Sequence, residues 1–252
     1  MSIETKQLVR ALDEFLASKQ IADYCPNGLQ VEGRPQIRRI VTGVTASQAL
    51  IDAAIEQQAD AILVHHGYFW KGEDPCISGM KQRRIKSLLA HDINLLAYHL
   101  PLDVHPRVGN NVQLAQLLGL EVSGPLEADN PHSVGLLGEL AQPLSSSEFA
   151  ALIGQKLQRA PLVIGSKERI RTVGWCTGAA QGYITHAIAA GADAFITGEI
   201  SEHSTHSALE NDICYFAAGH HATERYGVKA LGEWLAAEFG IEQQFIDCPN
   251  PV

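Results

Sequence analysis

Apolar and polar residues follow two different periods along the chain. Short apolar runs such as "AILVHH" (61–66) and "INLLAYHL" (93–100) are typical of strands buried on both faces. Between such runs, segments such as "SQALIDAAIEQQ" (47–58) carry apolar residues three or four positions apart, which predicts amphipathic helices. Buried strands that alternate with helices indicate an α/β fold with mainly parallel sheets and helical cover.

The first half of the chain is expected to begin with an amphipathic helix, because Leu8, Leu12 and Phe15 follow helical spacing. After it, "ADYCPNGLQVEG" (22–33) is rich in turn formers and predicts a loop. The pattern then predicts a strand at 37–45, a helix at 47–58, a strand at 61–66, a helix at about 78–91, a strand at 93–100 and a helix at 110–119.

Two prolines and several turn residues in "EVSGPLEADNPHS" (121–133) predict a domain boundary, with domains at 1–125 and 126–252. The second half resembles the first. Residues 41–66 align without a gap on 174–199, which places Ala59-Asp60-Ala61 on Ala192-Asp193-Ala194. Either any two strand-helix-strand units look this similar, or the chain is an internal duplication with two similar α/β domains. We favour the duplication.

The second domain is expected to repeat the strand and helix alternation. Its predicted elements are a strand near 134–140, a helix at about 147–157, strands near 161–164 and 171–176, a helix at 179–191 and a strand at 193–199.

Composition narrows the class of protein. With 252 residues, 46% of them hydrophobic and 19% charged, the chain is long enough for one large core or two modest ones. A formal net charge of −9 argues against nucleic-acid binding, and no apolar run approaches the ~18 residues that a membrane helix needs. The five cysteines are scattered without a C-x-x-C pair, and the N-terminal segment lacks a signal-peptide pattern, so we expect a cytoplasmic location.

Two adjacent histidines end the apolar run at 61–66. Ligands of open α/β sheets collect beyond the carboxyl ends of parallel strands, and His65 and His66 lie at such an end. Neighbouring side chains of a straight strand point to opposite faces, but Gly67 frees the backbone so that both rings can turn toward neighbouring ions. The alternative is one buried histidine with an ordinary hydrogen bond and one exposed histidine.

Two later segments offer further ligands. In "GHHATER" (219–225), His220 and Glu224 are four positions apart and share one face if a helix begins there. A carboxylate in the first turns of a helix is favoured by the helix dipole. Asp103 follows another predicted strand, in "YHLPLDVHP" (98–106). The alternative interpretations are a solvated helix face for the first pair and a turn aspartate for Asp103.

Together these segments offer three histidines and two carboxylates, which suits two divalent cations that share a carboxylate. Zinc, iron or manganese suits mixed imidazole and carboxylate ligands, whereas calcium does not. Five protein ligands leave coordination positions for water or substrate, as in catalytic metal sites. The predicted ligands are His65, His66, Asp103, His220 and Glu224.

Five motifs occur in the order found in one family: "PNGLQVEG", "AILVHHGYFWKG", "YHLPLD", "ITGE" and "GHHATER". Over nearly its whole length the chain resembles the GTP cyclohydrolase 1 type 2 homologues, in the short form that lacks the extra domain some relatives insert between the halves. The resemblance implies two similar α/β domains, a dinuclear metal centre with Glu224 as the bridge, and a ring-shaped homohexamer built as a trimer of dimers. It also places His99 close to the centre. Many relatives read H-T-x-x-D where this chain has "HLPLD", so Pro101 puts the role of His99 in question.

The leading functional hypothesis is a hydrolase that uses metal-activated water on a small-molecule substrate, which the family name suggests to be GTP or a related nucleotide. In this hypothesis His99 carries a proton, and Glu199, which aligns with His66, either supports the site or forms an ordinary surface contact. The second hypothesis is a non-catalytic metal-holding ring that binds a protein or nucleic-acid partner. A covalent enzyme using Cys25 or Cys76 is a remote third, since neither has an obvious histidine partner.

No P-loop or dinucleotide-binding glycine motif is present to hold a triphosphate. "GVTAS" (43–47), between a predicted strand and a predicted helix, has two interpretations. It either offers backbone N–H groups to a phosphate or forms a simple capped turn with Ser47 as the N-cap, and we favour the capped turn.

Overall fold

The computed structural model describes residues 1–130 and 132–252, which form two compact units. Unit 1 comprises Met1–Val108 and Gly227–Cys248, and unit 2 comprises Gly109–Tyr226 and Pro249–Val252. The units therefore differ from the expected halves 1–125 and 126–252, because the chain enters unit 2 at residue 109 and returns to unit 1 at residue 227. Within the described residues, no helix is both long and apolar enough to cross a membrane.

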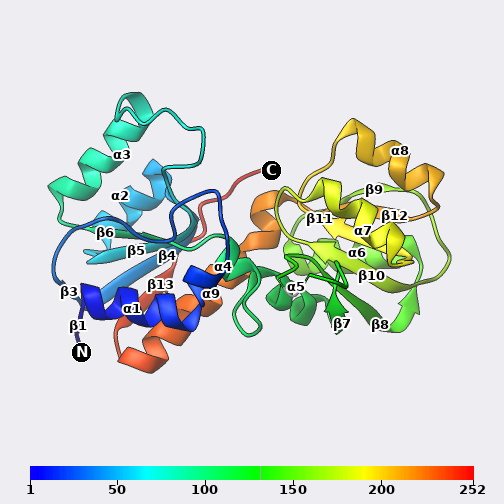
Figure 1. The fold of residues 1–252 in the computed structure, drawn as a ribbon, viewed down its shortest axis with the longest axis horizontal. Helices are drawn as coiled ribbons and strands as arrows, with labels where there is room; N and C mark the ends of the chain where they lie inside the picture. The colour runs from blue at the N-terminus through cyan, green and yellow to red at the C-terminus, as the bar shows by residue number, and fades with distance from the viewer. Residues whose placement is uncertain (131) are drawn as a thin grey trace. The chain divides into compact units, whose positions relative to one another are not determined.

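Unit 1 contains a five-stranded sheet in the order β13-β4-β5-β6-β2 (Figure 1). All neighbouring pairs in this sheet are parallel except β2 with β6, and β1 and β3 form a separate antiparallel pair. The elements are β1 (Ile3–Glu4), α1 (Thr5–Phe15), η1 (Ser18–Gln20), β2 (Gly28–Val31), β3 (Gln36–Ile37), β4 (Arg39–Thr45), α2 (Gln48–Glu56), β5 (Ala61–His66), α3 (Gly79–Ala90), β6 (Asn94–Ala97), α4 (Leu100–Asp103), the C-terminal part of α9 (His220–Phe239) and β13 (Glu242–Phe245).

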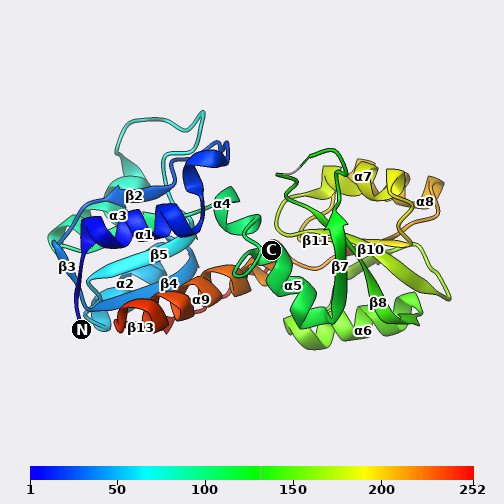
Figure 2. The same cartoon turned by 60° about the horizontal axis from the view of Figure 1, so that its bottom comes forward.

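The two faces of this sheet are covered by different helices, because successive strand residues point to opposite sides. Ala61 and Leu63 of β5 pack in one core with α1 and α9, whereas Ile62 and Val64 pack in another with α2 and α3. Both faces are buried, which explains why β5 is a continuous apolar run rather than an alternating one. Figure 2 shows α1 and α9 on the same face of the sheet.

Unit 2 contains a six-stranded mixed sheet in the order β7-β8-β10-β11-β12-β9. The pairs β10-β11 and β11-β12 are parallel, and the remaining pairs are antiparallel. The elements are α5 (Asn110–Leu118), β7 (Leu120–Pro125), β8 (Leu136–Leu144), α6 (Ser146–Leu157), β9 (Leu162–Ile164), β10 (Ile170–Cys176), η2 (Gln181–Tyr183), α7 (Ile184–Ala189), β11 (Ala194–Thr197), α8 (Glu202–Glu210), β12 (Cys214–Ala217) and the N-terminal part of α9.

Helices again cover both faces of the sheet. Phe216 of β12 packs with α5 and α6, and Tyr215, its neighbour, packs on the opposite face with α7 and α8. Each unit therefore has the same three-layer arrangement of helices, sheet and helices, as the hydrophobic pattern predicts.

Equivalent hydrogen bonds support the internal duplication. The Asp60 carboxylate, before β5, accepts the backbone N–H groups of Arg38 and Arg39. The Asp193 carboxylate, at the matching position before β11, accepts the backbone N–H groups of Arg171 and Thr172. Both aspartates thus join the start of one strand to its neighbour in the same way, which unrelated strand-helix-strand units would not be expected to share.

Two segments differ from the prediction. The expected loop at 22–33 contains the strand β2, and the expected boundary at 121–133 contains most of β7, with residue 131 outside the described residues. Both are edge strands that carry glycine or proline, so their pairing depends on a neighbouring strand rather than on their own composition. The "GVTAS" turn is a capped turn, since the Ser47 hydroxyl accepts the N–H of Leu50 at the start of α2.

Candidate metal centre

The seven predicted site residues fall into two sets, one in each unit. Unit 1 holds His65, His66, His99 and Asp103, and unit 2 holds Glu199, His220 and Glu224. The structure brings the members of each set together, as the contacts of each side chain show.

His65 and His66 end β5, and their side chains lie next to each other with ring centroids 4.5 Å apart. The ligand atoms of these two rings and of His99 all lie within 4.8 Å of one another, so the three could hold a metal ion. His66 Nδ1 lies 3.4 Å from the Thr45 hydroxyl on the neighbouring strand. Gly67 was expected to free the backbone, but its role is to leave space for a neighbouring side chain. A Cβ at this position would overlap Gln30, whose side chain is hydrogen-bonded to the backbone of Tyr68.

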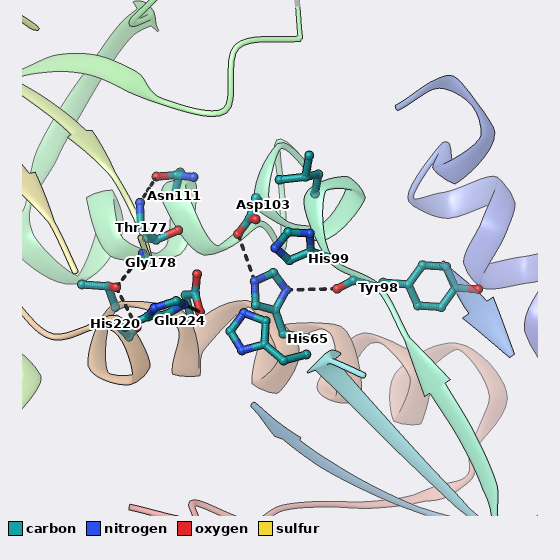
Figure 3. A network of polar contacts seen from close by, with 12 residues as sticks. His65, Tyr98, His99, Asp103, Asn111, Thr177, Gly178, His220 and Glu224 are labelled. Carbon is teal, nitrogen blue, oxygen red and sulfur yellow. Dashed lines mark hydrogen bonds and ion pairs between the residues drawn. The ribbon is translucent and has the colours of Figure 1, made fainter. Parts of the chain in front are cut away.

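The ring of His65 is held in one orientation. Its Nδ1 lies 3.0 Å from the backbone carbonyl of Tyr98, and a carbonyl only accepts, so Nδ1 carries the proton (Figure 3). The other nitrogen, Nε2, faces Asp103 Oδ1 at 3.5 Å. A neutral imidazole would thus turn a lone pair toward a carboxylate, an arrangement that a cation between the two groups would stabilise. Metal-bound histidines commonly donate their second N–H to a carbonyl in this way.

Asp103 is positioned by the short helix α4, which begins directly after β6. His99 is the N-cap of this helix, and the N–H of Asp103 donates to its carbonyl oxygen over 3.1 Å. Pro101 occupies the first turn, where a missing N–H costs no helical hydrogen bond. Pro101 is therefore compatible with the helix that places His99 and Asp103 four residues apart on one turn.

Asp23 is a site residue that the sequence did not reveal. Its carboxylate lies 3.0 Å from His99 Nδ1 and accepts the side-chain N–H of Asn27 and the backbone N–H of Leu100. Burial alone would raise the pKa of Asp23, but these hydrogen bonds outweigh it and lower the pKa to about 2. An ionised Asp23 fixes the Nδ1–H tautomer of His99 and leaves Nε2 as its acceptor nitrogen.

The unit 2 set is built at the start of α9. His220 lies between two carboxylates, with Nδ1 2.7 Å from Glu199 Oε1 and Nε2 3.1 Å from Glu224 Oε2. Burial alone would lower the pKa of His220, but Glu224 and Glu199 outweigh it and raise the pKa to about 9. Without a metal, this ring holds a proton where a cation could bind between Nε2 and Glu224.

A small-residue turn after β10 gives Glu224 its space. Gly178 has a positive φ of 69°, and a Cβ on it would overlap Glu224 Oε1 and lie 3.2 Å from His220 Nε2. The turn is fixed by two hydrogen bonds. Thr177 N–H donates to the Asn111 side chain (Figure 3), and Gly178 N–H donates to the Thr223 hydroxyl. Only glycine fits this position, both for its backbone conformation and for the two ligand groups beside it.

The two sets occupy matching positions in the duplicated fold. In unit 1 the short helix α4 follows β6, and in unit 2 the start of α9 follows β12. Each carries a histidine and a carboxylate four residues apart: His99 with Asp103, and His220 with Glu224. The preceding parallel strand ends at His66 in unit 1, and Glu199 lies at the matching position in unit 2. The duplication therefore supplies two related sets of donor groups, one at the same place in each unit.

The thiol of Cys25 is not suited to nucleophilic catalysis. Burial, and then the carboxylates of Asp23 and Asp103, raise its pKa to about 12, so the reactive thiolate is disfavoured near neutral pH. The remaining chemistry of the site is that of imidazoles and carboxylates, which suits divalent zinc, iron or manganese.

Comparison with known proteins identifies the family. Residues 3–251 match the family described as Duf34/NIF3 (NGG1p interacting factor 3). The chain belongs to the Duf34/NIF3 family. A relative from Pseudomonas aeruginosa PAO1, named GTP cyclohydrolase 1 type 2 homolog, is 64% identical over 251 residues that cover 100% of both chains. One of the same name from Escherichia coli K12 is 52% identical over 99% of this chain and 100% of its own. The resemblance seen in the sequence motifs is thereby confirmed.

Solved Duf34/NIF3-like structures share the fold. Protein ybgI, described as of unknown function, has a TM-score of 0.96 and 52% identity over 99% of this chain and 100% of its own. TTHA1606 from Thermus thermophilus has a TM-score of 0.90 and 36% identity over the same shares of the two chains. The predicted α/β fold is therefore confirmed, while the relatives' names do not by themselves establish an activity.

Proposed function

We propose that this Duf34/NIF3 protein is a divalent-metal-dependent hydrolase. The observation that carries the proposal is the orientation of two buried or half-buried imidazoles, His65 and His220. The Nδ1 of His65 contacts a backbone carbonyl, and the Nδ1 of His220 contacts a carboxylate. In both rings Nε2 faces a carboxylate within 3.5 Å. Such pairs of oriented imidazole and carboxylate are the ligands that zinc, iron and manganese prefer.

The proposed ligands are His65, His66 and Asp103 from unit 1 and His220 and Glu224 from unit 2. The two proposed ligands of unit 2 are one imidazole and one carboxylate, which is too few for a stable site of its own. In the proposal the two sets would hold a common pair of ions, and Glu224 would supply the shared carboxylate that the family resemblance implies. The support for this step is the number and chemistry of the donors together with the family resemblance.

Metal ions at such a site lower the pKa of bound water toward neutrality and so supply the nucleophile. His99 is the proposed proton carrier. Asp23 keeps the proton on Nδ1, so Nε2 is the nitrogen that accepts a proton from a reacting group and returns it to the product. Glu199 holds His220 in place through Nδ1 and does not itself need to contact the substrate.

The proposed substrate is GTP or a related nucleotide, and the support is the name carried by relatives that match the whole chain. Opening of a guanine ring requires addition of water and transfer of protons, which is the chemistry that the imidazole and carboxylate sets provide. The proposed assembly is the homohexameric ring, a trimer of dimers, that the family resemblance implies.

A second candidate is a metal-holding scaffold for a protein partner. It is favoured by the family description, which names an interacting factor. In this case the metal would stabilise the fold and no substrate would be turned over. The two candidates share the metal site and differ only in turnover.

The test is metal analysis of the purified protein, followed by assay of the metal-loaded protein on a panel of nucleotides, pterins and phosphodiesters. We expect two ions per chain and hydrolysis of at least one nucleotide. We expect Glu224→Ala to lose both ions and His99→Ala to keep them while turnover falls. His91→Ala, which replaces an exposed histidine at the end of α3, is the matched control and should change neither.

The results separate the candidates. Two ions with no turnover on any compound of the panel would reject the hydrolase and favour the scaffold. Absence of stoichiometric metal after loading would reject both.

A further inference from the structure

Two aromatic side chains stand beside the histidines of unit 1 and have no part in the proposed chemistry. Trp70, four residues after His66, lies with its ring centroid 6.0 Å from that of His66 and 5.0 Å, edge to face, from that of His99. Tyr24 lies 5.0 Å from His99, also edge to face, and 5.7 Å from Trp70. The two rings come from different loops and meet at the same imidazole.

Both rings are accessible. Tyr24 is 52% exposed and Trp70 is half-buried. Tyr68 of this unit is packed inside a hydrophobic core. Tyr24 and Trp70, in contrast, lie at the surface beside the imidazoles of unit 1. Aromatic surface next to oriented imidazoles is typical of ligand sites, in which apolar faces give affinity and a few polar groups give orientation.

Hydrogen bonds restrict the Trp70 ring and join its loop to the loop of Tyr24. Trp70 Nε1 donates to the Gly67 carbonyl over 3.2 Å, and its backbone N–H donates to Glu73 Oε2. The N–H of Lys71 donates to the Tyr24 carbonyl over 2.7 Å, which joins the two loops. A ring whose rotation is already restricted loses little conformational entropy when a ligand binds, so the Nε1 contact prepares the Trp70 ring for binding.

The backbone is arranged to turn Trp70 outward. Phe69 adopts a positive φ of 67°, a conformation that costs free energy for a residue with a side chain. The change of direction leaves Tyr68 and Phe69 packed against the unit 1 core, with Lys81 over the Phe69 ring, and it directs Trp70 toward His99. A strained residue between the core aromatic Tyr68 and the surface aromatic Trp70 indicates that the surrounding contacts hold this turn in place, and with it the position of Trp70.

We propose that Trp70 and Tyr24 form the binding surface for a planar fused nitrogen heterocycle, of the nucleobase or pterin class, whose edge then lies beside His66 and His99. Stacking suits this class because every such ring has a π-face, and each stacked base contributes enough binding energy to be measured by mutation. Polar ring edges suit the neighbouring imidazoles, whereas a sugar phosphate without a base has no π-face to stack on the two aromatic rings. The inference rests on the proposed function and specifies its substrate class.

The experiment measures binding to the metal-loaded full chain by isothermal titration calorimetry. The probes are guanosine 5′-monophosphate, a pterin, and ribose 5-phosphate, which lacks the ring. We expect both ring compounds to bind at least tenfold more tightly than ribose 5-phosphate. We expect Trp70→Leu to weaken their binding about tenfold or more, Tyr24→Leu to weaken it less, and Trp70→Phe to restore most of it. Comparing the two ring compounds distinguishes a nucleobase from a pterin.

The matched control is Tyr183→Leu, which removes a tyrosine that lies 5.4 Å from a histidine, His186, in unit 2. It should leave binding unchanged. The inference is overturned if neither ring compound binds, if ribose 5-phosphate binds as tightly, or if Trp70→Leu and Tyr24→Leu both stay within twofold of the unaltered chain. Metal content is measured on the same samples. If the chain holds no metal but still binds the ring compounds, the proposed function alone is rejected. If the chain holds two ions but binds neither ring compound, this inference alone is rejected.

Discussion

At the scale of single residues, the candidate site depends on groups that orient ligands as much as on the ligands. Tyr98 and Glu199 hold the Nδ1 atoms of His65 and His220, and Asp23 holds that of His99. The candidate ligands could be proposed from the sequence because a histidine pair, an aspartate after a strand, and a histidine and glutamate at i, i+4 together form the donor inventory of a metal site. Asp23 cannot, because nothing local distinguishes it from a turn aspartate until the fold brings it to His99.

Gly178→Ala should remove metal binding without unfolding the chain. The new Cβ would overlap Glu224 Oε1, and the positive φ would cost about 1 kcal/mol in any case. Gly191→Ala is the matched control, since Gly191 has nearly the same φ, 70°, and nothing within 4 Å of a Cβ. We expect similar small losses in unfolding free energy for both variants and loss of metal, measured by elemental analysis, only for Gly178→Ala. Equal metal content in the two would contradict this role of Gly178.

Metal affinity should rise with pH up to about 9. The His220 pKa of about 9 means that the metal-free ring is protonated at neutral pH, and a cation must displace that proton to bind Nε2. Below this pKa, affinity gains roughly tenfold per pH unit from this group, and above it the gain ends. Manganese titrations at several pH values measure the slope.

Glu199→Gln provides the control for that pH dependence, because it removes one of the two carboxylates that raise the His220 pKa. In this variant, metal affinity should stop rising with pH at a lower pH than in the unaltered chain. Glu202→Gln, at an exposed glutamate 3.1 Å from His206, should leave the profile unchanged. A flat profile in the unaltered chain would show that His220 does not bind the metal.

At the scale of elements, the paired aspartates that join neighbouring strands should stabilise both units, but unequally. Asp60 is buried, accepts hydrogen bonds from two backbone N–H groups, and forms an ion pair with Arg34 at 2.8 Å. Asp193 accepts two backbone N–H groups and is more exposed. We expect Asp60→Ala to lower the unfolding free energy by about 3 kcal/mol and Asp193→Ala by about 1–2 kcal/mol. Urea unfolding measures both, with the exposed Asp52→Ala as control, and a larger loss for Asp193→Ala would contradict the argument.

The same scale shows which elements a sequence can predict. The strands β4, β5, β10 and β11 could be located because each is buried on both faces and forms a continuous apolar run. The edge strands β2, β7 and β13 could not, since "GLQV", "LEVSGP" and "EQQF" have weak strand character and are ordered by the strand beside them. The division at residue 125 missed the return of the chain to unit 1, because the parallel pairing of β13 with β4 joins residues about 200 positions apart.

At the scale of the whole molecule, the proposed centre would make metal binding and stability interdependent in both units. A ligand present at 100 times its dissociation constant stabilises the folded state by about 2.7 kcal/mol, which corresponds to a rise of roughly 5–11 °C in Tm for a chain of this size. Removal of metal with a chelator should therefore lower the Tm of the unaltered chain, as measured by calorimetry, and re-addition of zinc or manganese should restore it.

Single ligand variants then test whether the two sets act together. His65→Ala lies in unit 1 and Glu224→Ala in unit 2, and if both sets bind the same ions each variant alone should abolish most of the chelator-dependent change in Tm. If each unit bound its own ion independently, each variant would remove only part of the change and the double variant would remove the rest. His91→Ala should respond to the chelator like the unaltered chain. Because the two units hold separate hydrophobic cores, a response lost in full from either side can only come from ions that both units share.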